Sequence, residues 1–537
     1  MSKVLINQGA KYIIVPNLFD VGTTPRFILP EAIVSIISQY LLDANPQKKN
    51  NILRTRYLLP FSLNKLIYNT INQVLAIESQ IYFNHLNKKN NIPLAGQTGR
   101  EFILNNLHNR YSKLGLGNLA VKLADLFSLA TRSFNYFLDE ALSQLDSKIV
   151  YVDIYHLFNE IRDNPKFYGF DDIILPTCST VFFANETTCK NKTPGIYHPE
   201  KTYLFSDGVH PSPHMHLIFA QYMESIFNAP FKLSTITQQL ISDNNNSQDY
   251  LLNQLDNFNP SNDGKKTFSF VSFGGELSKT NYYDSKMSYS NNLNVGIAYA
   301  LDNNLIFGSM LNTSFGKLNP FLSFKYSFNS NLINLFSKYY FNNNFSVTSN
   351  FNIGRLNASD ITRIINLGKA NFIEKSNTHA KSIGFNISLN YNLFLNNNIT
   401  IAPYLNFNLH NYKTDPIIEY SNNSTAMKFH KSSITNKNIK LAFKITKQFN
   451  PKNISFFELA INSHIDKKHF NITSSLKNVK SAFNREIPFN YKSSFNCSLG
   501  FNHLFFNNLS LSSFLNYNFN PNNNYKFTYF LSLNRKF

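Results

Sequence analysis

The chain has 537 residues, of which 43% are hydrophobic and only 15% charged, and its formal net charge is +19. This length predicts at least two domains, and the composition excludes both a strongly disordered chain and one built from highly charged helices. Because the lysines are scattered and no nucleic-acid-binding motif occurs, we expect no nucleic-acid partner and expect the charge to face anionic lipid headgroups.

The first 229 residues have the pattern of an α/β domain. Residues 12–18 (YIIVPNL) and 149–155 (IVYVDIY) are short, uninterrupted apolar runs, as buried parallel strands require. Between them the chain is mostly helical, and apolar residues recur at three- and four-residue steps from Leu123 to Leu145. Residues 42 to about 116 form a helical insertion, either a lid over a pocket or, as we favour, a variable connection.

The next segment is a polar linker. Residues 230–264 predict a helix that is broken around residues 244–246, with a turn-rich boundary at residues 259–266 (NPSNDGKK). No run of 18 or more apolar residues occurs, so we expect no transmembrane helix. Residues 1–10 lack the apolar core of a secretory signal peptide.

The C-terminal half, residues 265–537, alternates with a period of two. Ile383, Phe385 and Ile387, for example, alternate with small or polar residues, and Asn-rich turns separate about ten such runs. A soluble β-domain is the alternative. The length of the pattern, its aromatic face and the final strand ending on Phe537 favour a closed transmembrane antiparallel β-barrel, because an open sheet edge cannot remain unpaired in lipid.

The sharpest local signal is the pair Asp207 and His210 in the segment YLFSDGVHPSPHMH. Such a histidine can act as general base to a serine while the aspartate orients its ring. The alternative is that Asp207 caps a turn and His210 is structural, because so short a motif is common by chance. A zinc site of His210, His214, His216 and His198 is disfavoured, because Pro211 and Pro213 interrupt the first turn and no Glu or Cys lies at ligand spacing, so we expect no metal.

These segments resemble a known family in the order in which they occur. Residues 203–223 resemble the last conserved block of GDSL lipases, also called SGNH hydrolases. Residues 150–170 (VYVDIYHLFNEIRDNPKFYGF) and 4–27 resemble the stretches that precede it in members fused to autotransporter barrels. Residues 265–537, preceded by a helix-prone linker, are similar to an autotransporter translocator.

The resemblance implies a multidomain protein. Residues 1–229 would be part of a flavodoxin-like SGNH hydrolase passenger, residues 230–264 a linker helix in the lumen, and residues 265–537 a barrel of twelve strands. It further implies a barrel among outer-membrane lipids, inserted by the barrel assembly machinery, with the passenger at the cell surface. The activity would be hydrolysis of a lipid or other acyl ester without a cofactor.

The sequence departs from this family at the nucleophile. No Gly-Asp-Ser occurs, and the Gly and Gly-x-Asn-Asp blocks that supply oxyanion donors are absent. We therefore expect this chain to contain the fourth and fifth strands of the hydrolase sheet, with His210 as the base and Asp207 as the residue that orients it. We expect no activity unless a separately encoded N-terminal fragment supplies the missing blocks. The alternative is a non-catalytic translocator or display protein that carries a passenger remnant.

The three cysteines differ in context. Cys178 and Cys189 are close together in a loop-like run and are candidates for a disulfide in an oxidising compartment; the alternative is two free thiols. Cys497 falls on the apolar face of a predicted strand, so we expect it to face lipid.

Overall fold

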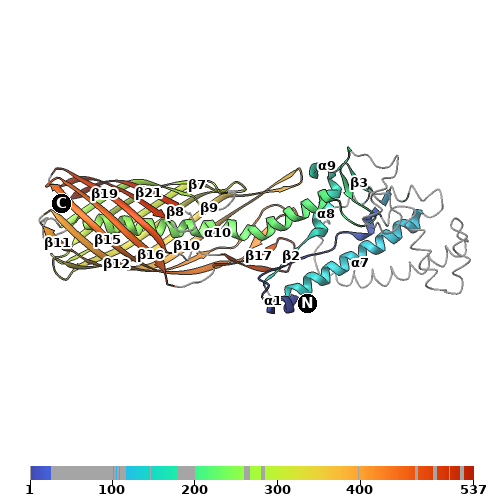
Figure 1. The fold of residues 1–537 in the computed structure, drawn as a ribbon, viewed down its shortest axis with the longest axis horizontal. Coiled ribbons are helices and arrows are strands. Elements are labelled where there is room, and N and C mark those ends of the chain that lie inside the picture. The colour runs from blue at the N-terminus through green and yellow to red at the C-terminus, as the bar shows by residue number, and fades with distance from the viewer. Residues whose placement is uncertain are drawn as a thin grey trace, which may run out of the picture.

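The computed structural model describes residues 2–25, 117–145, 147–177, 200–258, 266–279, 285–396, 398–465, 470–487, 493–506, 508–519 and 525–537, with isolated positions between 101 and 108. The molecule is elongated: a cylinder of strands lies at one end, helices and short strands lie at the other, and one long helix connects them (Figure 1). The predicted helical insertion, residues 42–116, falls almost wholly outside the described residues.

The N-terminal part contains two short parallel strand pairs. β1 (Ile13–Pro16) pairs with β2 (Ile149–Val152), as the apolar runs predict, and β3 (Asp172–Pro176) pairs with β4 (Tyr203–Phe205). All four residues of β2 are buried, as in a parallel strand covered on both faces. The helices among the described residues of this part are α1 (Ser2–Asn7), η1 (Val21–Thr23, a 3₁₀ turn), α7 (Gly117–Ser143), α8 (Ile154–Asp163) and α9 (Pro165–Tyr168).

Helix α7 has the predicted apolar periodicity, but not all of its apolar side chains are buried. Leu123 and Leu142 are buried, whereas Phe134 and Phe137 are 51% and 53% exposed. The apolar stripe is therefore only partly covered by the residues that the structure describes. No helix in these ranges is long and apolar enough to cross a bilayer.

Helix α10 (Pro213–Asp256) is the axis of the molecule. Ser212 caps its start by accepting a hydrogen bond from Met215 N at 3.2 Å, and its 44 residues span about 66 Å. The predicted break around residues 244–246 is wrong. Asn244 donates to Ser382 Oγ in the barrel wall at 3.2 Å and Asn246 to Glu276 at 2.5 Å, so tertiary partners keep poor helix formers helical.

The C-terminal half is a closed antiparallel barrel, as predicted. Within the described residues twelve strands form the wall, and β5 pairs with β21 while β10 pairs with β12, which leaves no open edge. The wall strands are β5 (Thr267–Lys279), β6 (Ser288–Ala300), β7 (Leu305–Phe321), β8 (Phe324–Tyr340), β9 (Phe345–Leu367), β10 (Ala370–Tyr391), continued by β11 (Leu393–Asn396), β12 (Ile399–Thr414), β15 (Ser432–Asn450), β16 (Asn453–His464), β19 (Ser494–Phe506), β20 (Leu509–Phe519) and β21 (Tyr525–Lys536).

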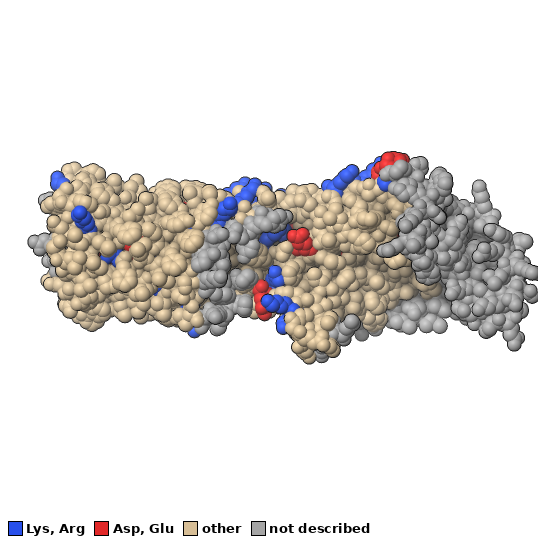
Figure 2. All heavy atoms as spheres, viewed as in Figure 1, with Lys and Arg blue, Asp and Glu red and all other residues tan. Residues whose placement is uncertain are grey.

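The wall has two zones with opposite polarity. Where it surrounds the C-terminal half of α10, Val295 and Ile297 face outward while Asn294 and Asn312 line the lumen. Nearer the N-terminal part, Phe324 and its neighbours on β8 and β9 point inward instead. Figure 2 shows an outer wall with few charged side chains over the first zone and a group of basic and acidic side chains where the second begins. The strands thus continue beyond the apolar belt and enclose the helix there.

A second sheet lies where the barrel meets the N-terminal part. Its strands are β13 (Ile417–Ile418), β14 (Met427–Phe429), β17 (Phe470–Leu476) and β18 (Phe483–Ile487), paired in that order and supplied by two connections between barrel strands. We call it the cap sheet. Its buried side chains belong to one hydrophobic core with those of β2, α8 and the first half of α10.

Candidate active site

Asp207 and His210 lie in the short loop between β4 and α10, and its backbone is closed at both ends. Ser206 N donates to His210 O and Ser212 N donates to Leu204 O, each at 2.9 Å. Pro213 then starts α10 in the position where a missing N–H costs no hydrogen bond. The loop is therefore a fixed turn held between a buried strand and a long helix.

Within this loop the carboxylate of Asp207 holds the imidazole of His210. Asp207 is buried; its Oδ1 accepts from His210 N at 2.7 Å and its Oδ2 lies 2.6 Å from His210 Nδ1. The His210 side chain is 69% exposed. With Nδ1 donating to the carboxylate, Nε2 of the neutral ring is left as the acceptor, which is the arrangement of a general base.

No nucleophile is paired with this base in the part of the chain that the structure describes. His210 Nε2 has no hydrogen-bond partner there. The two nearest hydroxyls in sequence are otherwise engaged: Ser206 Oγ donates to Pro211 O at 3.3 Å, and Ser212 Oγ caps α10. The structure thus brings together the two residues that the sequence predicted and adds no third.

The other histidines of this region do not join His210. His214 Nε2 lies 3.1 Å from Tyr168 O, and its ring packs against Phe170. The ring of His216 packs against Phe219. Across the described ranges, no three His, Cys, Asp or Glu side chains converge as a metal site would require. His198 lies outside these ranges.

Two of the three cysteines also lie outside the described residues, so the pairing of Cys178 with Cys189 stays a prediction. Cys497 is a free thiol on β19. It shares the outward face of its strand with Phe495 and Leu499, which are 48% and 53% exposed.

A second aspartate–histidine pair was not singled out from the sequence, although it has the same three-residue spacing. Asp153 caps α8: its Oδ1 accepts from His156 N at 3.2 Å, its Oδ2 contacts His156 Nδ1, and Asn17 donates to it at 2.8 Å. The Asp153 carboxylate raises the pKa of His156. Burial opposes ionisation of Asp153, but His156 and the hydrogen bonds outweigh it and hold the pKa of this carboxyl below its usual value. This pair fixes the first turn of α8.

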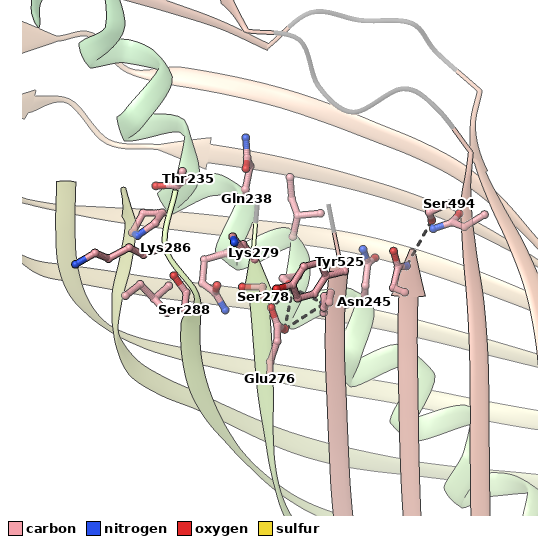
Figure 3. Close-up of a pocket in the computed structure, with 18 of the residues that line it drawn as sticks. Thr235, Gln238, Asn245, Glu276, Ser278, Lys279, Lys286, Ser288, Ser494 and Tyr525 are labelled. Carbon is pink, nitrogen blue, oxygen red and sulfur yellow. Dashed lines mark hydrogen bonds and ion pairs between the residues drawn. The ribbon is translucent and has the colours of Figure 1, made fainter. Parts of the chain in front are cut away.

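A cavity in the barrel lies between α10 and the wall, toward the end nearest the N-terminal part (Figure 3). Its volume is about 280 Å³. Glu276 on the wall accepts from Ser242 and Asn246 of α10 at 2.9 and 2.5 Å and pairs with Lys526 at 3.1 Å. Neither Asp207 nor His210 lines the cavity. Its polar side chains belong to the barrel lumen and hold α10 in place.

Comparison with known families agrees with this architecture. Residues 269–518, most of the barrel, match the autotransporter beta-domain family. The chain is 26% identical over 356 residues to Lipase 1 of Photorhabdus luminescens, an alignment that covers 65% of this chain and 52% of that protein. These similarities support a GDSL autotransporter with a barrel. Such a barrel lies in the outer membrane and carries its passenger at the cell surface.

Further relatives match shorter parts of the autotransporter. A GDSL esterase/lipase of Arabidopsis thaliana is 32% identical over 120 residues, which cover 21% of this chain and 30% of that protein. The translocator domain of autotransporter NalP from Neisseria meningitidis is similar in structure with a TM-score of 0.46 and 11% identity, covering 57% of this chain and 99% of that domain. The autotransporter thus spans about half the length of Lipase 1, and less of the plant relative.

Proposed function

We propose that the passenger is the base-bearing part of a surface-exposed serine ester hydrolase that acts on lipid or other acyl esters. The observation that supports this most directly is the Asp207–His210 pair: a buried carboxylate fixes an exposed imidazole whose Nε2 has no partner among the described residues. The similarity to a lipase and to a GDSL esterase/lipase indicates the same class of reaction.

In the reaction we propose, His210 Nε2 takes the proton of a serine hydroxyl as the serine oxygen bonds to the ester carbonyl carbon. His210 then gives this proton to the departing alcohol oxygen, which leaves an acyl-serine. Water releases the acid by the same proton transfers in reverse order. Asp207 stays ionised throughout and stabilises the imidazolium.

The serine must come from elsewhere, because these 537 residues contain no Gly-Asp-Ser and no oxyanion blocks. We infer that they do not hydrolyse esters alone, since loss of the nucleophile costs about a million-fold in rate. A polypeptide that supplies these blocks would complete the site. We also propose that residues 1–229, 230–264 and 265–537 are separate functional parts of the chain. Helix α10 nevertheless continues through residue 230 without interruption.

A second candidate function is a non-catalytic outer-membrane translocator that displays a passenger remnant. The absence of any described partner for His210 Nε2 favours it. In either case we propose that the barrel assembly machinery inserts the barrel and that outer-membrane lipids surround it.

The experiment that separates these functions is ester turnover by the purified chain with and without an added polypeptide carrying the missing blocks. Turnover of a short-chain nitrophenyl ester only in the mixture, abolished by His210→Ala, would support the split hydrolase. No turnover in the mixture would favour display. Robust turnover by the chain alone would contradict the proposed inactivity.

A further inference from the structure

Within the described residues, three extensions of the barrel contact the passenger. The β9–β10 hairpin touches α9 and α10: Lys369 N donates to Tyr168 O at 3.3 Å, and Gly368 N donates to Gln221 at 2.8 Å. The other two extensions belong to the cap sheet. They are the loop between β13 and β14 and the turn between β17 and β18, and they contact α8 and α7 (Figure 1).

The β13–β14 loop delivers Ser424 to the passenger. Ser424 N and Ser424 Oγ donate to the two carboxylate oxygens of Glu160 on α8, at 2.6 and 2.7 Å. Tyr222 of α10 donates to Ser424 O at 2.8 Å. Glu160 is thus a passenger carboxylate whose acceptors are filled mainly by a barrel loop, and hydrogen bonds to a charged group of this kind are stronger than neutral ones.

Barrel residues also hold this loop in place. Arg363 of β9 forms a buried two-point ion pair with Glu419 at 2.8 and 2.6 Å and donates to Thr425 O at 2.7 Å. Glu374 of β10 accepts from Thr425 Oγ1 and Ser421 Oγ at 2.6 and 2.5 Å. The position of Ser424 is therefore set by barrel residues on both sides of it.

The β17–β18 turn binds the end of α7 in a similar way. The carboxylate of Asp139 accepts from Lys480 N at 3.0 Å, Ser481 N at 2.9 Å and Ser481 Oγ at 2.7 Å. The next residue, Glu140, pairs with Lys480 at the surface, where both side chains are more than a third exposed. One carboxylate thus orders a barrel turn, whereas its neighbour makes a contact that contributes little.

Apolar packing continues across the same junction. Phe429, Ile472 and Ile487 of the cap sheet are buried in one cluster with the passenger residues Phe158 and Tyr168. The passenger's own sheets in the described ranges have two strands each, and a two-stranded sheet is marginal without further packing. The cap sheet therefore shares one hydrophobic core with the passenger elements that the structure describes.

We propose that the cap sheet is the platform on which the exported passenger folds, so that the passenger reaches and keeps its native structure only on its own barrel. The partner that this surface fits is the α7–α8 face of the same chain, recognised through Asp139 and Glu160. The inference concerns folding and attachment, and it holds whether or not the passenger hydrolyses esters.

Limited proteolysis of the full chain in detergent micelles tests this platform. The variants are Glu160→Ala and Asp139→Ala on the passenger and Ser424→Ala and Ser481→Ala on the cap sheet, with Glu140→Ala as the matched control. Heat-modifiable migration on a gel confirms in each case that the barrel is folded. We expect the passenger to be digested about tenfold faster in Asp139→Ala and Glu160→Ala, several-fold faster in both serine variants, and within about twofold of wild type in Glu140→Ala.

The cap-sheet variants decide the outcome, because they leave every passenger residue unchanged. Faster digestion of the passenger in Ser424→Ala and Ser481→Ala, on an intact barrel, supports the platform. Wild-type digestion rates in both would overturn it, since the passenger would then be stable without these contacts. The double variant Glu160→Ala/Ser424→Ala should be digested no faster than Glu160→Ala, because both remove one interaction; additive effects would contradict the direct contact.

Discussion

The backbone of Phe537, the last residue, exchanges hydrogen bonds with Thr267, the first residue of β5. Phe537 N donates to Thr267 O at 2.8 Å, and Phe537 O accepts from Thr267 N at 3.3 Å and from Lys266 N at 3.1 Å. The Phe537 ring is half-exposed and lies against the guanidinium of Arg535. The terminal residue thus closes the barrel through its backbone, at the seam between the first and last strands.

Deletion of Phe537 should impair closure of the barrel more than its replacement by alanine. The deletion removes three backbone hydrogen bonds of about 1 kcal/mol each at the seam, whereas Phe537→Ala retains them. The fraction of refolded protein that shows heat-modifiable migration should fall in the order wild type, Phe537→Ala, deletion. Equal fractions for the two variants would show that the side chain, and not the seam, is what matters.

Glu419→Gln should strongly destabilise the cap sheet. It leaves Arg363 as a buried cation without its carboxylate, and both side chains are only 3% exposed. We expect the free energy of unfolding of this region to fall by about 3 kcal/mol. Thermal unfolding in micelles would measure it. The double variant Arg363→Met/Glu419→Leu serves as the control, because it removes both charges and should recover most of the loss; a double variant worse than the single one would contradict this reading.

The Asp153–His156 pair should stabilise the passenger at mildly acid pH and less at alkaline pH. The pKa of His156 is raised, so its contribution is complete below its ordinary value of 6.5 and is lost as pH rises through the raised pKa. The pKa of Asp153 is lowered, so its contribution is present above 3.8 and is lost on further acidification.

The measurement for this pair is the difference in passenger melting temperature between wild type and His156→Asn. It should be largest near pH 5 to 6 and should shrink toward pH 9. Glu160 also raises the pKa of His156, so Glu160→Gln should move the upper limit of this window to lower pH. A melting difference that does not change with pH would contradict the ion pair.

The barrel could be predicted from the sequence because the pattern that requires it is contained within each strand. Strands with one apolar and one polar face, repeated to the last residue, require lipid outside and closure of the sheet. The paired strands β1 and β2 were also predictable, since each is a short apolar run beside helical periodicity. Asp207 and His210 were singled out because their surroundings resemble the last GDSL block, since the spacing alone is common by chance; their contact follows from a turn that brings residues three apart together.

The remaining features depend on contacts between distant residues. Nothing near Asn244 or Asn246 in the sequence shows that Ser382 and Glu276 will satisfy their side chains, so the continuous α10 was missed. In the sequence, Phe324 follows the same alternating pattern as the residues that face lipid. In the structure its side chain is buried instead, in the zone where the wall directs apolar residues inward. The cap sheet consists of strands of two to seven residues, too short for a periodic signal.

The central claim is that Asp207 and His210 form the base half of a serine esterase whose nucleophile these residues do not contain. Labelling with a fluorophosphonate tests it most directly, because this reagent modifies serines that are activated by a neighbouring base. Mass spectrometry of the purified, folded chain should find no stoichiometrically modified serine, and His210→Ala should not change that result. A single serine labelled to completion in wild type, and not in His210→Ala, would contradict the claim.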